Sequence, residues 1–328
     1  QRYLINAEPG LVHKAIHLIK PANQEFLHSN YTTDYLYDGR AGTLLVLLYC
    51  YLLSGDKSLV DPIQQFLNKI IGNAELSGTG VCWHSQEELN LKASCGFAYG
   101  AAGIRYVLQR LNHYCNNEAI DYIIKRTSAY IDNCWEPDIQ NWGDYRKPHL
   151  SSDALRNYRA SYAKGENNLF ARASDHSWAY GAAGILCSSL DNGTTMFKPS
   201  KLHNHTNKGR YASDCLYDGL AGIGLCLLQQ SGATEQFGFM DKYTNRPSQL
   251  DGGLMHGQAG ILYFLLQCNS AVKIRENILA PFLPQGSHEH ASMNIPVSVK
   301  QVRSALVAKC YPRTINLLKI LNPPGYEE

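Results

Sequence analysis

The stretch Ala179-Tyr180-Gly181-Ala182-Ala183-Gly184, which is followed by an apolar run, is one of five related segments in this chain. All five share the pattern x-x-Gly-x-Ala-Gly, and the other four begin at Tyr37, Ala98, Tyr217 and Met255. Because glycine has no Cβ, such a motif lets two stretches of backbone approach closely at the start of a helix. The recurrence of one motif through 328 residues indicates a repeat architecture.

Each motif leads into a segment that is mostly too apolar for a surface helix, and such helices belong inside a large structure. These predicted inner helices cover residues 43–53, 104–111, 185–190, 223–228 and 261–267. Amphipathic stretches between them, at 60–71, 119–131 and 271–282, predict outer helices. Stacked helix pairs bury a continuous core. We therefore expect an all-α fold, an α/α toroid of six or seven inner and outer helix pairs, with the glycine-led helix starts gathered at one end. The alternative is an open superhelix.

The composition excludes several classes of protein. The formal net charge is +2, which argues against a dedicated nucleic-acid binder. The chain is 45% hydrophobic and 18% charged, so it can bury a core and is not disordered. The longest apolar run, residues 43–53, is too short to cross a bilayer. The ten cysteines include no Cys-x-x-Cys pair, and we expect a reduced, cytoplasmic protein.

The motif order, with the segments Asp175-His176-Ser177-Trp178-Ala179-Tyr180-Gly181 and Leu254-Met255-His256-Gly257, resembles the lanthionine synthetase C-like family. These proteins are the cyclases of lanthipeptide biosynthesis and their eukaryotic relatives, and the likeness covers about residues 36–267. It implies one α/α-toroid domain over residues 1–328, either excised from a longer synthetase or acting beside one. It also implies a modified precursor peptide as partner, with a dehydratase or a kinase/lyase protein as a further partner.

The resemblance also bears on a metal site. The family's well-known members hold zinc with a Cys from Trp-Cys-Tyr-Gly and a Cys-His pair, and a further His is their proposed acid/base. The corresponding positions here carry Ala179, Tyr217, Asp218 and Tyr99. A second alignment places the Cys-His pair on Met255 and His256, which keeps the His and loses the Cys. At least two of the three ligands are missing either way, so the chain is similar to the branch without zinc ligands, and we expect no cofactor.

The turns before the glycines supply the candidate site. The predicted catalytic residues are His256, Tyr99, Asp218 and Asp38, and the predicted substrate-binding residues are Tyr37, His176, Trp178, Tyr180, Tyr217 and Met255. An imidazole can take the proton from a thiol, and a phenol or imidazolium can donate to the enolate formed when sulfur adds to a dehydroamino acid.

Most of these residues also have a structural interpretation. Asp38 and Asp218 are alternatively helix caps. Tyr99 and Tyr180 are alternatively wall residues, His256 a hydrogen-bonded structural histidine, and Trp178 a packing residue. Cys95 and Cys215 lie near the glycines and are alternatively small buried thiols.

Three functions remain open on the sequence. The first is a zinc-independent cyclase that adds a peptide Cys thiol to a dehydroalanine or dehydrobutyrine to form thioether rings. The second is a non-catalytic, peptide-binding subunit of a peptide-modifying complex. The third is a carbohydrate-active α/α-toroid enzyme that uses Asp38 and Asp218 as acid and base.

Overall fold

A computed structural model describes residues 9–29, 33–78, 80–84, 93–144, 175–188, 213–231, 252–269 and 293–307. The helices are α2 (Pro9–His28), α3 (Arg40–Ser54), η1 (Lys57–Leu59), α4 (Val60–Asn73), α5 (Ala101–Cys115), α6 (Glu118–Asn133), α8 (Ala182–Cys187), α10 (Leu220–Ser231) and α12 (Gln258–Asn269). A further helix covers 299–307. Two short antiparallel hairpins pair β1 (Glu75–Ser77) with β2 (Gly80–Cys82) and β3 (Trp135–Glu136) with β4 (Asn141–Trp142).

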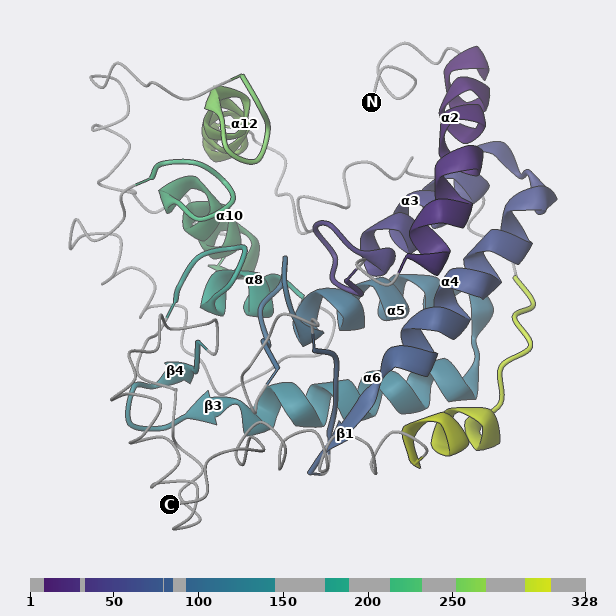
Figure 1. Ribbon diagram of the computed structural model, residues 1–328. Coiled ribbons are helices and arrows are strands. Elements are labelled where there is room, and N and C mark those ends of the chain that lie inside the picture. The colour runs from purple at the N-terminus through teal and green to yellow at the C-terminus, as the bar shows by residue number, and fades with distance from the viewer. Residues whose placement is uncertain are drawn as a thin grey trace, which may run out of the picture.

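The helices form two layers of an arc. The inner helices α3, α5, α8, α10 and α12 follow one another in sequence order, and α2, α4 and α6 lie outside them (Figure 1). Helix α3 packs against α4, and α5 packs against α6. This arrangement confirms the predicted α/α toroid, because every inner helix begins directly after the first glycine of a motif.

The outer helices agree with the sequence pattern in two places and differ in one. Helices α4 and α6 confirm the amphipathic stretches at 60–71 and 119–131. The stretch at 271–282 lies outside the described residues. We did not predict α2, which contains Pro21; an internal proline normally argues against an uninterrupted helix.

In the second to fifth motifs, the second glycine lies where two turns cross. A Cβ on Gly184 would lie 1.9 Å from the carbonyl oxygen of Trp178 and 2.6 Å from Cβ of Phe97, which belongs to the preceding motif. At Gly103 the same positions are occupied by the carbonyl oxygen of Phe97, at 1.9 Å, and Cβ of Leu36, at 2.8 Å. No side chain fits there, so the glycines of the motif allow neighbouring repeats to pack in contact.

Helices α3, α5 and α8 are capped by backbone and not by side chains. At the start of α8, the N–H of Ala182 donates to the carbonyl oxygen of Asp175 over 3.1 Å, and α3, α5 and α10 begin in the same way. These bonds satisfy N–H groups that a helix start leaves without intrahelical partners. The N-cap of α3 is Gly39, and no side chain caps this helix. The capping interpretation of Asp38 is therefore wrong.

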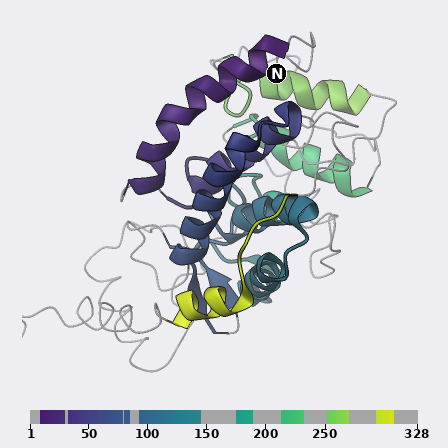
Figure 2. The same cartoon turned by 90° about the vertical axis from the view of Figure 1, so that its right-hand side faces the viewer.

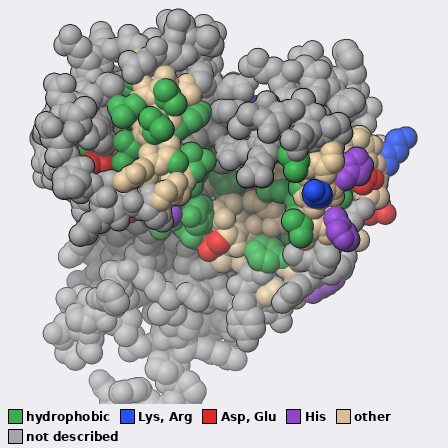
Figure 3. Space-filling model, turned by 90° about the horizontal axis from the view of Figure 1, so that it is seen from above, with side chains coloured by type: hydrophobic (Ala, Val, Ile, Leu, Met, Phe, Trp, Pro, Cys, Tyr) green, Lys and Arg blue, Asp and Glu red, His purple; other side chains and the backbone are tan. Residues whose placement is uncertain are grey.

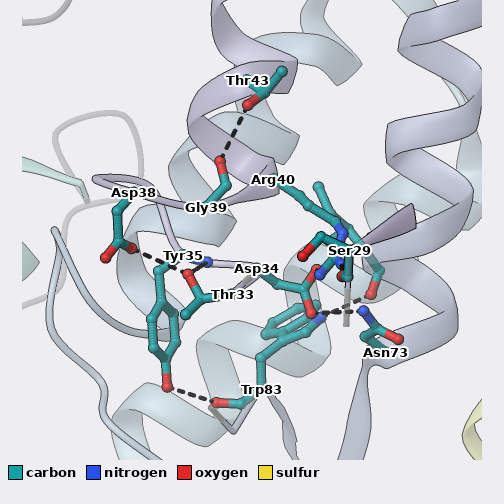
Figure 4. A network of polar contacts seen from close by, with 11 residues as sticks. Ser29, Thr33, Asp34, Tyr35, Asp38, Gly39, Arg40, Thr43, Asn73 and Trp83 are labelled. Atoms are coloured by element: carbon teal, nitrogen blue, oxygen red, sulfur yellow. Dashed lines mark hydrogen bonds and ion pairs between the residues drawn. The ribbon is translucent and has the colours of Figure 1, made fainter. Parts of the chain in front are cut away.

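The first motif is tied to the outer layer by a buried ionic network (Figure 4). Arg40 Nη1 lies 3.1 Å from Asp34 Oδ1, and both side chains are buried. Asn73 Nδ2, at the end of α4, donates to Asp34 Oδ2 over 2.9 Å. Arg40 Nη2 donates to the carbonyl oxygen of Ser29, just beyond α2. One ion pair therefore joins α2, α3 and α4 to the turn that precedes α3.

The segment 293–307 lies on the outer layer beside α5 and α6 (Figure 2). Asn117, the N-cap of α6, accepts hydrogen bonds at Oδ1 from the N–H groups of Ala119 and Ile120. Its Nδ2 donates to the carbonyl oxygens of Ile295 and Val297, over 3.0 and 3.1 Å. The start of α6 therefore holds the segment in place.

Seen from above, the molecule has a hollow between the α12 side, where hydrophobic side chains gather, and the α2 side, which carries Lys and His (Figure 3). Leu262 and Leu266 on α12 are 58% and 59% exposed. Among the helices that the structure describes, none is long and apolar enough to cross a lipid bilayer.

Candidate functional site

The turns before the glycines are joined by a chain of backbone hydrogen bonds, which we call the turn ladder. Each bond links the residue two positions before the first glycine of one motif to its counterpart in the next. The donor N–H and acceptor C=O pairs are Tyr37 to Ala98 (3.0 Å), Ala98 to Ala179 (2.7 Å), Ala179 to Tyr217 (2.9 Å) and Tyr217 to Met255 (2.9 Å). The ladder brings segments far apart in sequence to one end of the inner helices.

Five side chains from these turns meet, and we call them the mouth cluster: Tyr37, Tyr99, Tyr180, Tyr217 and His256. The rings of Tyr99 and Tyr180 are stacked, with centroids 5.6 Å apart. The hydroxyl groups of Tyr180 and Tyr217 are hydrogen-bonded over 2.9 Å. The rings of Tyr217 and His256 lie 4.2 Å apart. Each motif thus contributes one aromatic or imidazole ring to one cluster, as the sequence predicts.

The first and last motifs meet through Tyr37 and His256. The hydroxyl group of Tyr37 is hydrogen-bonded to His256 Nε2 over 3.1 Å, although the two residues are 219 positions apart. Tyr37 is 42% exposed and His256 is also exposed. An imidazole is therefore accessible to solvent and already in contact with a phenol.

Three phenols of the cluster, those of Tyr37, Tyr99 and Tyr217, remain protonated at neutral pH. Burial, followed by the nearby Tyr180, Asp38 and Cys215, raises the pKa of Tyr37. Burial is also the main cause that raises the pKa of Tyr99 to about 12. The pKa of Tyr217 is raised by burial and by its hydrogen bond with Tyr180. These groups can donate hydrogen bonds and do not supply phenolate charge.

The two acidic residues lie beside the cluster, each with a partner in its own turn. Asp38 is exposed and its Oδ1 accepts a hydrogen bond from Thr33 Oγ1 over 3.1 Å. Asp218 is exposed, and its Oδ1 accepts from the thiol of Cys215 over 3.1 Å. Burial, the largest cause, raises the pKa of that thiol, so Cys215 stays protonated.

Three predicted substrate-binding residues are placed differently from our expectation that they line the mouth. Trp178 is 3% exposed and its ring packs edge-on against Phe97 at 5.0 Å, which agrees with the packing interpretation. His176 is 6% exposed, and its Nε2 is 3.3 Å from Nδ2 of Asn141 on β4. Met255 packs its half-buried side chain on the core and contributes its backbone to the turn ladder. Trp178 and His176 therefore lie inside the wall, because their turn folds back onto its neighbours.

Two residues at the site were not among the predicted site residues. Thr33 holds Asp38, and no motif marks it because it lies before the repeat begins. Cys215 lies close enough to raise the pKa of Tyr37, whereas the thiol of Cys95 is buried and lies 3.9 Å from the carbonyl oxygen of Gly143. The position of Cys215, four residues before Gly219, was the available signal, but the same spacing fits a buried thiol.

Two residues at the zinc-ligand positions that the family resemblance implies, Ala179 and Tyr217, do not fit a zinc ion. Ala179 has no donor atom, and the hydroxyl group of Tyr217 is neutral and bonded to that of Tyr180. Zinc in proteins is held by thiolate, imidazole and carboxylate groups. Within the ranges that the structure describes, no group of three or more His, Cys, Asp or Glu side chains could hold a metal ion.

Comparison with known proteins bears on the family and the fold. The family model described as "Lanthionine synthetase C-like protein" matches residues 8–211. Among solved structures, the chain is similar to nisin cyclase, with a TM-score of 0.53 and 16% sequence identity over 78% of this chain and 69% of that one. At this identity the likeness supports the fold alone. A search of curated proteins found no match.

Proposed function

Since the chain belongs to the lanthionine synthetase C-like family, we propose that it is a zinc-independent cyclase of dehydrated, Cys-containing peptides. The observation that carries the proposal is the exposed pair of Tyr37 and His256, whose hydroxyl and Nε2 atoms are 3.1 Å apart. The pair lies beside Tyr99 and Asp38, so an acid–base group and neutral hydrogen-bond donors share one accessible place.

The reaction follows from these groups. His256 takes the proton of the peptide thiol, because the thiolate is the nucleophile. The sulfur adds to Cβ of a dehydroalanine or dehydrobutyrine, a C–S bond forms, and the electron pair of the C=C bond moves into an enolate. Tyr99, neutral below about pH 12, donates a hydrogen bond to the enolate oxygen. The imidazolium of His256 then returns the proton to Cα. No atom is lost or gained.

The acid–base role of His256 is tested with a matched pair of variants. The protein is incubated with a dehydrated Cys peptide, and free thiol is titrated while the peptide mass is followed. We expect thiol to disappear at constant mass, and His256→Gln to lose about 100-fold or more in rate. The control is His113→Gln, an exposed histidine on α5 whose ring contacts Tyr114. It should keep the full rate.

Two results would contradict the proposal. Undiminished turnover in His256→Gln would exclude the acid–base role. A stoichiometric metal in the purified protein, with activity lost in chelator and restored by zinc, would exclude zinc independence.

A non-catalytic peptide-binding subunit is the second candidate. It is favoured by hydrogen bonding within the mouth cluster, since the hydroxyl groups of Tyr180 and Tyr217 are bonded to each other and Ala179 offers no functional group. This protein would bind the dehydrated peptide with no loss of thiol, and Tyr37 and His256 would affect the dissociation constant only. The same thiol and binding measurements, repeated with a dehydratase or a kinase/lyase protein present, test whether the protein acts alone or beside such a partner.

A further inference from the structure

Tyr37 is held at the mouth with its hydroxyl group 3.1 Å from Nε2 of His256. Its N–H donates to the carbonyl oxygen of Ala98 over 3.0 Å, which fixes its backbone. Its ring lies against the rings of Tyr99 and Tyr217, with centroids 5.7 and 4.9 Å apart. The ring of His256 lies 4.2 Å from that of Tyr217, so one phenol positions both partners. The contact between hydroxyl and imidazole is therefore set by the packing of the whole cluster.

The hydrogen bond between Tyr37 and His256 has a preferred direction. Burial, followed by the nearby Tyr180 and Asp38, raises the pKa of Tyr37, so its hydroxyl group keeps its hydrogen. A neutral imidazole carries one hydrogen, and its other ring nitrogen is an acceptor. A phenol is a stronger acid than a neutral imidazole N–H, and an imidazole nitrogen is a stronger base than a phenol oxygen. The stable arrangement therefore has Tyr37 donating to Nε2, which places the hydrogen of His256 on Nδ1.

This direction decides how a proton can reach the imidazole. Nε2 already accepts a hydrogen bond from Tyr37, so a thiol cannot use the same lone pair without displacing the phenol. The hydroxyl oxygen of Tyr37 has lone pairs of its own and can accept a hydrogen bond while it donates one. The contact is exposed, and Tyr37 itself is 42% exposed. A substrate thiol can therefore donate to Tyr37 while Tyr37 remains bonded to His256.

We propose that Tyr37 is a further catalytic residue, which relays the proton of the substrate thiol to His256. As the S–H bond of the peptide Cys breaks, its proton moves to the oxygen of Tyr37, and the hydrogen of that hydroxyl group moves to Nε2. The thiolate forms the C–S bond, and the electron pair of the C=C bond moves into the enolate. The proton returns to Cα by the reverse route, from Nε2 to Tyr37 and from Tyr37 to carbon. Both residues end as they began, and no atom is gained or lost.

This inference rests on the proposed function and adds a residue to its proton path. The first measurement needs no activity: it is the tautomer of His256, read from the nitrogen chemical shifts of its ring at a pH above the titration of the imidazole. The signal is assigned by its absence in His256→Gln. We expect the hydrogen on Nδ1 in the parent protein. In Tyr37→Phe, which keeps the ring and removes the hydroxyl group, it should move largely to Nε2, the position that an imidazole without this partner prefers.

The second measurement asks whether Tyr37 and His256 act as one unit. Loss of thiol from a dehydrated Cys peptide is followed in Tyr37→Phe, in His256→Gln and in the double variant. Each single variant should lower kcat about 100-fold, and the double variant should lose no more than the slower single one. A phenol that only packs or binds the peptide would act independently, so its effect would multiply with that of His256 or appear in KM.

The matched control is Tyr114→Phe. This tyrosine has its ring against the exposed His113 on α5, with centroids 4.9 Å apart, and it is not part of the mouth cluster. The variant should keep the parent rate and leave the tautomer of His256 unchanged.

The outcomes separate the relay from the proposed function. Three results would each overturn the relay and leave the cyclase in place: hydrogen on Nε2 of His256 in the parent, a loss of about fivefold or less in Tyr37→Phe, which is the value of one hydrogen bond, or losses that multiply in the double variant. If the parent consumes no thiol, or if His256→Gln keeps the parent rate, the proposed function fails, and the relay falls with it.

Discussion

The turns of the first and third motifs have the same backbone and different surroundings. Both begin an inner helix by donating to upstream carbonyl groups, Arg40 to Thr33 and Ala182 to Asp175. In the third motif, Ala179 is fully buried and uses both its N–H and its C=O in the ladder. In the first motif, Tyr37 is 42% exposed, and within the described part of the chain only its N–H takes part in the ladder. The glycines therefore determine where a turn lies, whereas the exposure of the residues before them differs from motif to motif.

The largest effect should come from breaking the third motif at Gly184. In Gly184→Ala, the new Cβ would lie 1.9 Å from the carbonyl oxygen of Trp178 in its own turn and 2.6 Å from Cβ of Phe97 in the preceding repeat, so both the turn and the contact between the repeats must shift. We expect a loss of about 3 kcal/mol or more in the free energy of unfolding. The measurement is denaturant unfolding followed by circular dichroism.

The control for this prediction is Gly72→Ala on the outer helix α4. A Cβ at Gly72 has no atom within 4 Å, and alanine favours the helix over glycine by about 0.5–1 kcal/mol. Equal losses in the two variants would show that close approach of the turns is not what the motif glycines provide.

A comparable effect is expected at the first motif, whose ion pair has no counterpart in the third. Arg40→Met leaves the carboxylate of Asp34 buried and without its cation, which should cost about 3–5 kcal/mol. The double variant Arg40→Met with Asp34→Leu removes both charges and should recover most of that loss. Thermal and denaturant unfolding of the two variants and the parent measure the difference. A double variant no more stable than the single one would contradict this account of the pair.

Much of this architecture could be predicted because glycine spacing and apolar runs are local signals. The inner helices at 43–53, 104–111, 223–228 and 261–267 are all present, and so are the outer helices at 60–71 and 119–131. The cluster of Tyr37, Tyr99, Tyr180, Tyr217 and His256 also follows from one assumption, that equivalent turns meet. Periodicity supplies both results, since a repeat places equivalent residues in equivalent positions.

The remaining features depend on contacts that no local pattern encodes. Trp178 and His176 share a turn with Tyr180, yet the turn directs them into the wall. Asp38 and Asp218 directly precede a glycine, where a side-chain cap is common. The upstream carbonyl groups occupy the helix N–H groups instead, which only the fold of the whole turn decides.

The smallest predicted effect on stability at neutral pH concerns Tyr99 in the second motif. Its effect on stability becomes larger in alkaline solution. Its pKa is raised to about 12, above the value of about 10 for an unfolded chain. The stabilisation from the neutral phenol is therefore complete below pH 10 and is lost as the pH rises from about 10 to 12.

Unfolding midpoints measured across that interval, with phenolate absorbance as a second readout, should fall less steeply for Tyr99→Phe than for the parent. Identical slopes for the two proteins would contradict the assignment.

The side-chain amide of Asn117 serves two neighbours at once, because its oxygen caps α6 and its nitrogen holds residues 295 and 297. Replacing it with aspartate or serine, both good caps, would preserve the helix start and release the downstream stretch. Anchorage of that stretch can therefore be lost through a substitution that looks conservative from the viewpoint of α6 alone. In Asn117→Asp, the side-chain nitrogen is replaced by oxygen. This change would remove the two hydrogen bonds to residues 295 and 297 and leave the inner helices unchanged.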